Sequence, residues 1–575
     1  MALTACEFVY PTPPDGAPVP QLQFSLSEPE PLKGEFTITV TAVNFDPQQM
    51  TFRLDDFTAA PIHVDSSAPF TLTLNTADLT TGPHDIWVNA KDATYTVRQK
   101  FRPAFWQPPN LVAILVDDLD ETGTPYWDAM PQTRALLADQ GLVFENAFVT
   151  DPVCCPSRAA NLTGRYPHNT GVFDNSPPDG GYQVFAAGPQ NDTIATRLQS
   201  KGYATSFFGK YLNGYNHNEP VPPGWTEWFA THQAPYFVGF GYNANHNGTT
   251  ETFGWDTHDY ETDVLSRHAR DFITASEADD ARPFYVSINP LAPHANMGPA
   301  PRHQPNPYGA AVLPTSPNFN EADVSDKPTW LRDGFPLASE SDLQNETTRY
   351  RQGFGSLLAV DDMVADLVDT LEQTGELEQT VFVFTSDNGY NLRSHRLGHK
   401  MVPYEESIRV PFVVAGAGVR VGTEDRFVTN IDITPTLLEL ADAGPQPDLD
   451  GRSFAPLLAD EPTQWRSDFL IEYRGTYVLG PRLDTLADVQ AAIAAHGSLT
   501  VPPSYRALRT EEWLYVEWYS GAQHEYELYD MAADQYQLSN LISTPAGAAA
   551  HETLTDALQA RLVQLGACSG ATCRE

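Results

Sequence analysis

Short runs in which apolar and polar residues alternate fill the first part of the chain. Between Pro11 and about Arg102 they include Phe36–Val43 and Phe70–Leu74, with turn-forming residues between the runs. Alternation with a period of two indicates strands with one buried face, and the abundant Thr and Val favour that conformation. We therefore predict an antiparallel β-sandwich for residues 1–105.

Beyond a proline-rich linker at Trp106–Pro109, the apolar runs become continuous. Asn110–Val116 and Val381–Ser386 are almost entirely apolar. Such runs indicate strands that are buried on both faces, as in the middle of a parallel sheet. Helical patterns lie between them, at Ile194–Leu198, Val264–Ile273 and Leu357–Leu371. This alternation predicts an α/β domain with a mostly parallel sheet over residues 106–445.

The last part of the chain changes character again. Two amphipathic runs, Phe469–Tyr473 and Trp513–Trp518, have the pattern of strands, and a helical pattern follows from about Ala548 to Leu565. We predict that residues 446–575 form a small subdomain with an antiparallel sheet and a helix.

The charge of the chain excludes one large class of partners. The 575 residues contain 34 Lys and Arg against 74 Asp and Glu, which gives a formal charge of −40. Nucleic acid would be repelled from such a surface, so we expect no nucleic-acid partner. The acidic residues are spread along the sequence, which indicates a solvated anionic surface. The longest strongly apolar run, Leu111–Val116, is far shorter than the ~18 residues of a membrane span, and no transmembrane segment is predicted.

The five cysteines carry information about the compartment. Cys568 and Cys573 close a short loop whose spacing suits a disulfide, which favours an extracellular or periplasmic location, although two free thiols are the alternative. Leu3–Cys6 is similar to the end of a bacterial lipoprotein signal, but the charged and apolar regions that precede such a site are absent. A lipid anchor through Cys6 and a chance match both remain open.

The segment from Cys154 to Arg165 reads Cys-Cys-Pro-Ser-Arg-Ala-Ala-Asn-Leu-Thr-Gly-Arg and has the clearest chemical character. Taken by itself, a Cys just before a helix with Arg158 nearby is a candidate thiolate nucleophile. The segment also resembles the sulfatase signature, Cys-x-Pro-Ser-Arg followed by Leu-Thr-Gly-Arg, at every fixed position.

The resemblance to sulfatases implies a fold, a modification and a partner. The fold is the alkaline-phosphatase-like α/β architecture. Cys154 would be oxidised to Cα-formylglycine by the formylglycine-generating enzyme, and its hydrated aldehyde would be the nucleophile. Arg158 would stabilise that group. Cys155 occupies the variable position of the signature, where we expect a small packed residue.

Four oxygen-bearing side chains follow the two predicted central strands. Asp117 and Asp118 end one run, and Asp387 and Asn388 end the other. The carboxyl ends of parallel strands are where ligands bind, and an all-oxygen set suits Ca²⁺ or Mg²⁺ rather than Zn²⁺. All four match the metal positions of sulfatases, which implies a Ca²⁺ site, with Mg²⁺ as the alternative, that also includes the modified Cys154.

Further segments resemble sulfatase elements and imply contacts with sulfate. Lys210 lies in Phe-Gly-Lys-Tyr-Leu, His294 in Leu-Ala-Pro-His and Lys400 in Gly-His-Lys. A sugar alkoxide leaves poorly and needs a proton, for which His294 and Lys400 are the candidates, and we expect His294 to carry more of this role. His395 is a further candidate, as a second acid or as a substrate contact.

Together these matches, which span about Asn110 to Leu541, imply a sulfuric ester hydrolase. Their style resembles the branch of N-acetylglucosamine-6-sulfatases and arylsulfatases, so the expected substrate is a sulfated glycan or an aryl sulfate. Two alternatives stay open. One is a phosphonate or phosphate monoester hydrolase of the same superfamily, and the other is an inactive carbohydrate-binding surface protein. The N-terminal sandwich resembles immunoglobulin-like modules and is expected to be a spacer or a carbohydrate-surface adaptor.

Overall fold

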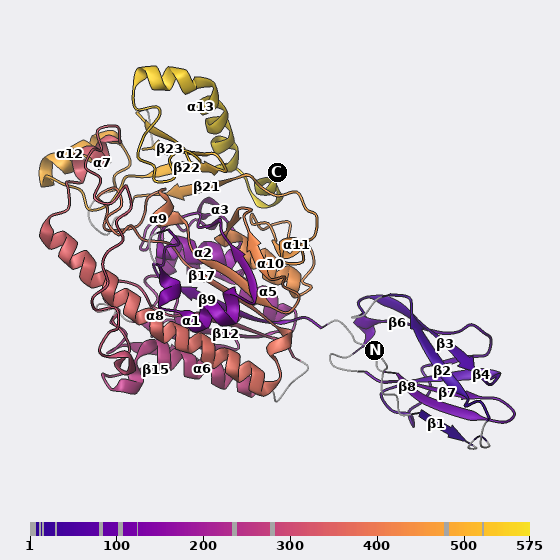
Figure 1. Cartoon of the computed structure of the whole chain (residues 1–575). Coiled ribbons are helices and arrows are strands. Elements are labelled where there is room, and N and C mark those ends of the chain that lie inside the picture. The colour runs from indigo at the N-terminus through magenta and orange to yellow at the C-terminus, as the bar shows by residue number, and fades with distance from the viewer. Residues whose placement is uncertain are drawn as a thin grey trace. The chain divides into compact units, whose positions relative to one another are not determined.

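The computed structural model divides the chain into two compact units, which are described separately (Figure 1). The first runs to Pro108 and the second begins at Pro109. The structure describes residues 7–10, 13, 17–28, 32–79, 84–101, 107–122, 125–232, 238–276, 282–475, 482–519 and 523–575. The candidate lipidation site Cys6 lies outside these residues. Within them, no helix is long and apolar enough to cross a membrane.

The N-terminal unit consists of two antiparallel sheets. One has the strand order β1-β8-β7-β4-β5 and the other β2-β3-β6. Phe36 and Ile38 of one sheet and Phe52 and Val88 of the other are buried in one shared core, so the alternating strands predicted from the sequence are present. Their bounds are β1 Glu7–Tyr10, β2 Gln21–Leu26, β3 Glu35–Val43, β4 Gln49–Leu54, β5 His63–Asp65, β6 Phe70–Asn75, β7 Ile86–Lys91 and β8 Thr96–Phe101.

A mixed, mostly parallel sheet forms the centre of the second unit. Its order is β15-β14-β13-β12-β16-β9-β17-β18-β10-β19. The central strands β13, β12, β16, β9 and β17 are parallel, and antiparallel pairs flank them on both sides. The bounds are β9 Asn110–Val116, β10 Gly141–Phe144, β12 Ala204–Lys210, β13 Glu227–His232, β14 Asn243–His246, β15 Thr249–Thr252, β16 Phe284–Asn289, β17 Thr380–Ser386, β18 Phe412–Gly416 and β19 Gly422–Glu424.

Helices cover both faces of this sheet, which explains the continuous apolar runs. On β9, Val112, Ile114 and Val116 pack with α6 (Glu261–Ser276) and α8 (Glu340–Thr374), which cross in front of the strands in Figure 1. Leu111 packs on the opposite face, in the core that includes α2, α5 and α10. Those helices span Cys154–Thr163, Ile194–Ser200 and Ile433–Leu440.

A four-stranded antiparallel sheet follows toward the C-terminus, in the order β21-β22-β23-β24. Leu558, Leu562 and Leu565 of the last helix pack on Leu470 and Leu508 of this sheet. The predicted sheet and helix are confirmed, and so is the predicted Cys568–Cys573 disulfide. The bounds are β21 Asp468–Tyr473, β22 Tyr505–Thr510, β23 Trp513–Trp518, β24 Glu525–Asp530 and α13 Pro545–Leu565.

Short elements connect these layers. They are α1 Pro131–Thr133, β11 Ala147–Phe148, α3 Pro167–Thr170, α4 Gly181–Ala186, α7 Thr329–Gly334, α9 Glu405–Ile408, β20 Val428–Thr429, α11 Ala455–Leu458 and α12 Leu486–His496. Strands β11 and β20 pair in parallel beside the main sheet.

Gly209 fixes how closely β12 and β16 approach. Its φ is +108°, and a Cβ atom there would lie 2.1 Å from the Asn289 carbonyl oxygen. We predict that Gly209→Ala lowers the free energy of unfolding by ~3 kcal/mol, from backbone strain plus the clash. Urea unfolding measures this. Gly202→Ala is the control, since its φ of +93° meets no atom within 4 Å and its cost is only the ~1–2 kcal/mol of strain. Equal losses for the two variants would contradict the clash.

Candidate active site

The carboxyl edge of the parallel strands brings most of the predicted site residues together. Asp117 follows β9 and Asp387 follows β17, and the register pairs the preceding residues Val116 and Ser386. Lys210 is the last residue of β12. Polar side chains that are far apart in the sequence thus meet where the parallel strands end.

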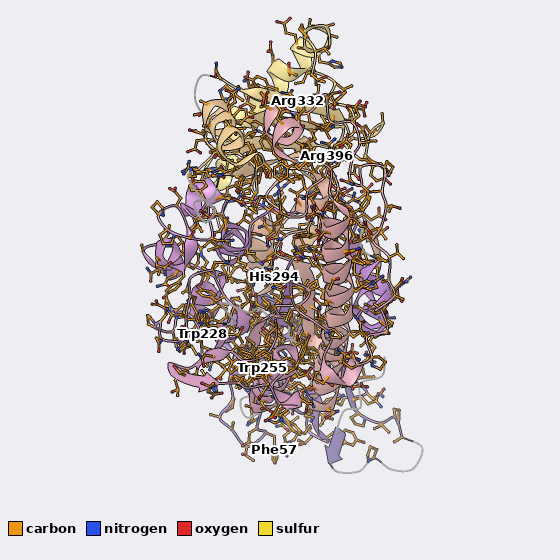
Figure 2. The ribbon with its side chains drawn as sticks, turned by 90° about the vertical axis from the view of Figure 1, so that its left-hand side faces the viewer. Phe57, Trp228, Trp255, His294, Arg332 and Arg396 are labelled. Carbon is orange, nitrogen blue, oxygen red and sulfur yellow. A yellow bond between two sulfur atoms is a disulfide. The ribbon has the colours of Figure 1, made fainter. Side chains whose placement is uncertain are left out.

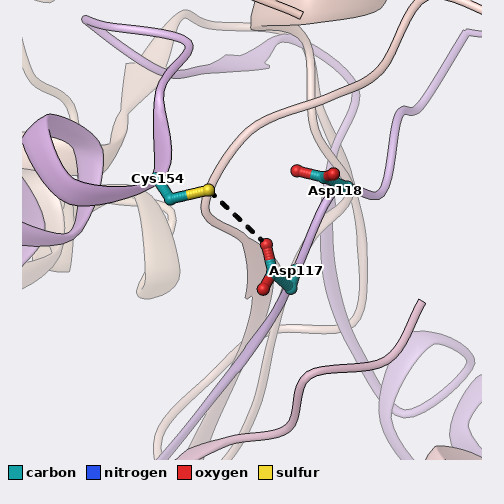
Figure 3. A group of neighbouring side chains, drawn as sticks. All are labelled: Asp117, Asp118 and Cys154. Carbon is teal, nitrogen blue, oxygen red and sulfur yellow. Dashed lines mark hydrogen bonds between the residues drawn. The ribbon is translucent and has the colours of Figure 1, made fainter. Parts of the chain in front are cut away.

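Cys154 is the first residue of α2, and its side chain lies at the same edge of the sheet. Figure 3 shows its Sγ atom directed toward the Asp117 carboxylate, with Asp118 beside it. The distance from Sγ to Asp117 Oδ1 is 3.8 Å, and one ligand atom from each of the three residues lies within 4.8 Å of the others. Cys154 is 2% exposed, whereas Cys155, on the same helix, is part of the apolar core.

Two lysines supply positive charge to this buried group. Lys210 Nζ contacts the Asp117 carboxylate, and Lys400 Nζ contacts that of Asp118. Lys400 Nζ also lies 2.8 Å from Cys154 Sγ. Both lysines therefore point at the predicted nucleophile and at its acidic neighbours.

Arg158 connects three of the strand ends. Its Nε donates to Asp387 Oδ2 at 2.7 Å, and its Nη1 donates to the Lys210 carbonyl at 2.8 Å and to Asn289 Oδ1 at 3.4 Å. Its Nη2 is buried, has no hydrogen-bond partner among the described residues, and lies 3.9 Å from Asp117 Oδ2. The guanidinium therefore keeps an N–H donor for a group bound at the cluster.

The charges shift the ionisation of these groups in opposite directions. Burial opposes ionisation of Asp117 and Asp118, but the ammonium groups of Lys210 and Lys400 outweigh it and lower both pKa values. Burial raises the pKa of the Cys154 thiol to about 11, despite the same lysines. The carboxylates of Asp117 and Asp118 are therefore charged at neutral pH, while the cysteine is a protonated thiol and a poor nucleophile.

His294 lies beside the cluster in the segment after β16. Its Nε2 atom is 3.8 Å from Asp118 Oδ2, and its side chain is 22% exposed. Burial lowers its pKa, although Asp117 and Asp118 act in the opposite direction. The imidazole is the partly accessible group at the edge of a buried site, a suitable place for exchanging a proton with a bound molecule.

His395 is not brought to the cluster. Its Nδ1 bonds to Glu321 Oε2 at 2.7 Å and its Nε2 to Asn318 Nδ2 at 3.2 Å, while its ring lies 4.4 Å from that of Tyr404. The side chain is fully buried, and burial lowers its pKa to about 3. These contacts describe a neutral histidine in the interior.

Arg349 is a site residue that sequence reasoning missed. It lies on α8, with Nη2 3.4 Å from Asp118 Oδ2 and its guanidinium 3.4 Å from the centre of the Tyr390 ring. Nothing in Thr-Thr-Arg-Tyr-Arg marks this arginine. Only the packing of α8 on the sheet reveals its position.

The donor atoms at this edge fit a hard divalent cation. Asn388 Nδ2 donates to Asp118 Oδ1 at 2.7 Å, while Asn388 Oδ1 is buried and has no hydrogen-bond partner among the described residues. A buried oxygen without a donor is costly unless a ligand satisfies it. Beside the carboxylates of Asp117 and Asp118, this oxygen suits a cation that prefers oxygen ligands.

The family is established by comparison with known proteins. A family model described as "Sulfatase" matches residues 109–443, which is more than half of the chain. This chain belongs to the sulfatase family. The match covers the segments that carry Asp117, Cys154 and Lys400. The protein is a sulfatase, an enzyme that hydrolyses sulfate esters.

Several known proteins, a named sulfatase among them, are similar to this protein over most of its chain. The N-acetylglucosamine-6-sulfatase of Capra hircus is 33% identical over 488 residues, covering 81% of this chain and 85% of that protein. A solved structure described as in complex with its substrate D-glucosamine-2-N,6-O-disulfate has a TM-score of 0.66 at 22% identity, covering 80% and 97% of the two chains. A phosphonate monoester hydrolase from Silicibacter pomeroyi has a TM-score of 0.59 at 21% identity, covering 79% and 95%. The two structural matches show the alkaline-phosphatase-like fold alone.

Proposed function

We propose that this sulfatase removes sulfate from a carbohydrate, with 6-O-sulfated glucosamine units as the first substrate class. The observation that carries the proposal is the convergence of Cys154, Lys210 and Lys400 on one buried acidic edge. The 33% identity to an N-acetylglucosamine-6-sulfatase supports the sugar. A phosphonate or phosphate monoester is the competing substrate. A phosphonate monoester hydrolase has a similar fold, and a shared fold does not determine the substrate.

The nucleophile in this proposal is the formylglycine made from Cys154. Burial raises the pKa of the thiol to about 11, so an unmodified Cys154 would be a weak nucleophile. The modifying enzyme must act before α2 packs, since Cys154 is 2% exposed. The modified residue would supply a gem-diol hydroxyl for attack on sulfur, which would break the bond between sulfur and the sugar oxygen. The second hydroxyl would then lose its proton as sulfate leaves and the aldehyde forms again.

The residues around Cys154 are proposed to bind and orient the sulfate. Lys210, Lys400 and the unpartnered Nη2 of Arg158 present positive charge and N–H donors on the side where Sγ points. Donors fixed in a buried site stabilise developing negative charge more strongly than water does. Ca²⁺, with Mg²⁺ as the alternative, is proposed to bind Asp117, Asp118, Asp387, Asn388 and the modified residue 154, where it would withdraw charge from the sulfate oxygens.

We assign the leaving-group proton to His294. The His294 side chain is 22% exposed. Burial lowers its pKa, which favours a neutral ring in the free enzyme. To act as an acid, the ring would need to take up a proton when the substrate binds. Lys400 is proposed to act by charge, because the carboxylates of Asp118 and its neighbours raise its pKa. His395 has no part in this proposal, given its bonds to Glu321 and Asn318.

The remaining proposals concern location and the N-terminal unit. We infer an extracellular or periplasmic protein from the Cys568–Cys573 disulfide. The two-sheet unit is proposed to be an immunoglobulin-like module that serves as a spacer or carbohydrate-surface adaptor. We keep the proposed boundaries at 1–105, 106–445 and 446–575, with the last two as parts of one sulfatase unit.

The first test concerns the modification. Peptide mass spectrometry of active protein is expected to find an aldehyde in place of the Cys154 thiol. Cys154→Ala is predicted to abolish sulfate release, whereas Cys155→Ala, which alters only core packing, is predicted to retain most of it. An unmodified Cys154 in fully active enzyme, or equal losses in the two variants, would overturn the proposal.

The cation is tested by metal analysis and by Asn388→Leu. We expect about one Ca²⁺ or Mg²⁺ per chain, loss of activity in a chelator, and recovery with the same metal. Asn388→Leu removes the unpartnered oxygen and is predicted to weaken cation affinity at least tenfold, as measured by metal titration of the stripped protein. Asn391→Leu is the control, since Asn391 is a buried amide of the same loop whose oxygen also has no hydrogen-bond partner among the described residues, but whose Nδ2 bonds to His399 and Ser407 and not to Asp118. Restoration by zinc alone would contradict the oxygen site.

The reaction is tested on a panel of substrates: a 6-sulfated glucosamine, 4-nitrophenyl sulfate, and the matching phosphate and phosphonate esters. Sulfate release from the sugar is expected to exceed turnover of the phosphorus esters. His294→Ala is predicted to slow the sugar sulfate at least tenfold more than the aryl sulfate, because nitrophenolate leaves without a proton. Equal slowing of both sulfates would make His294 a sulfate-binding residue.

A further inference from the structure

Trp255 is an exposed aromatic side chain that the proposed reaction does not use. Its exposure is 70%, and it is the one tryptophan among the exposed large apolar residues that the structure describes. Trp228, labelled with it in Figure 2, is fully buried, as a tryptophan in a core normally is. An exposed indole combines a large apolar surface with a polar N–H, which is the character of aromatic residues that contact ligands.

The Trp255 indole packs against Phe240 and Gly241. Its ring lies 6.0 Å from that of Phe240, with 16° between the planes. A Cβ atom at Gly241 would lie 3.0 Å from the indole, so the glycine is what allows the ring to lie against the backbone. Gly241 N donates to the Gly254 carbonyl at 2.8 Å, and Gly254 N donates to Asp259 Oδ2 at 2.9 Å. The indole therefore contacts Phe240 and Gly241 while most of its surface stays exposed.

The strand topology places this indole at the edge that carries the active site. Lys210 pairs with Thr231 near the end of β13. Residue Asn243 of β14 pairs with His232 on one side and with Thr252 of β15 on the other, so the turns that carry Phe240 and Trp255 project from that edge.

A short series of contacts joins the indole support to the His294 segment. The Phe240 ring lies 5.3 Å from that of Tyr260, whose hydroxyl donates to the Gly298 carbonyl at 2.8 Å. Met297 N donates to the His294 carbonyl at 3.1 Å, and a Cβ atom at Gly239 would lie 3.0 Å from the Met297 side chain. The indole and the proposed proton donor are thus supported by the same packed segment.

We propose that Trp255 is a stacking platform for a pyranose ring of the substrate chain, further along the chain from the sulfated sugar, on the same edge of the sheet as the Cys154 cluster. This rests on the proposed carbohydrate substrate. Sugar rings present apolar C–H faces that stack on aromatic rings, and an indole that is 70% exposed offers a surface for such stacking. The segment that follows Trp255 carries the carboxylates of Asp256 and Asp259, with the His258 imidazole 3.7 Å from the Asp259 carboxylate. Because like charges repel, the platform accepts an uncharged sugar and disfavours one that bears sulfate or a carboxylate.

The direct test measures binding by calorimetry in the full chain with Cys154→Ser, which removes turnover. The ligands are 6-sulfated N-acetylglucosamine and an N-acetylglucosamine tetrasaccharide with one 6-sulfate at its non-reducing end. Trp255→Ala is expected to weaken tetrasaccharide binding about tenfold, equivalent to ~1.4 kcal/mol, and to leave the monosaccharide unchanged. Trp255→Phe should restore part of the loss.

Val421→Ala is the matched control, since Val421 is 63% exposed at another part of the surface. It should bind both ligands like the parent. Unchanged tetrasaccharide binding in Trp255→Ala, equal weakening of both ligands, or no tetrasaccharide binding by the parent would each overturn the platform. A parent that binds through Trp255 while the Cys154 enzyme releases no sugar sulfate would contradict the proposed function alone.

A second arm tests the charge of the platform sugar. The tetrasaccharide with an added sulfate on each inner sugar is expected to bind at least threefold more weakly than the singly sulfated one. Asp256→Asn is predicted to reduce that difference, because it removes one exposed carboxylate from the segment that follows Trp255. Equal binding of the two tetrasaccharides, or no change in Asp256→Asn, would show that these carboxylates do not select an uncharged ring.

Discussion

A buried set of opposite charges is the constraint around which the catalytic unit is built. Asp117, Asp118 and Asp387 are each at most 8% exposed. Removing a carboxylate from water costs several kcal/mol, and only close partners of opposite charge offset that cost. Lys210 forms an ion pair with Asp117, and Lys400 forms one with Asp118. Arg158 forms an ion pair with Asp387. The cluster is therefore stable only when strand ends and the start of α2 hold one another in place.

The sheet provides this alignment through its register. Parallel β9 and β17 end side by side, β12 ends with Lys210, and Arg158 bonds across from α2 to the Lys210 carbonyl. Helices cover both faces, so a shift of any central strand would disturb packed apolar residues as well as the charges. Gly209 allows β12 and β16 to approach closely just before the lysine.

The two adjacent cysteines show how the same helix serves two purposes. Cys154 Sγ faces Asp117 and Lys400, while Cys155 is buried among apolar residues with a pKa raised by burial to about 12. Burial raises the pKa of both thiols, so neither is a reactive thiolate at neutral pH. A modification limited to Cys154 would add reactivity where positive charge and oxygen ligands already converge.

The sequence by itself was enough to predict the central strands, the sulfatase signature and the oxygen-bearing residues at the strand ends, because these depend on local patterns. Continuous apolar runs marked β9 and β17, and their polar ends marked Asp117 and Asp387 as neighbours. Tertiary structure decided the rest. His395 is near Lys400 in sequence, yet a turn of the chain buries it against Glu321, while Arg349 reaches Asp118 from a helix without any motif. Trp255 likewise acquires its place only through strand pairing. Such contacts join residues far apart along the chain, and side-chain periodicity reports burial but not which distant segment provides the partner.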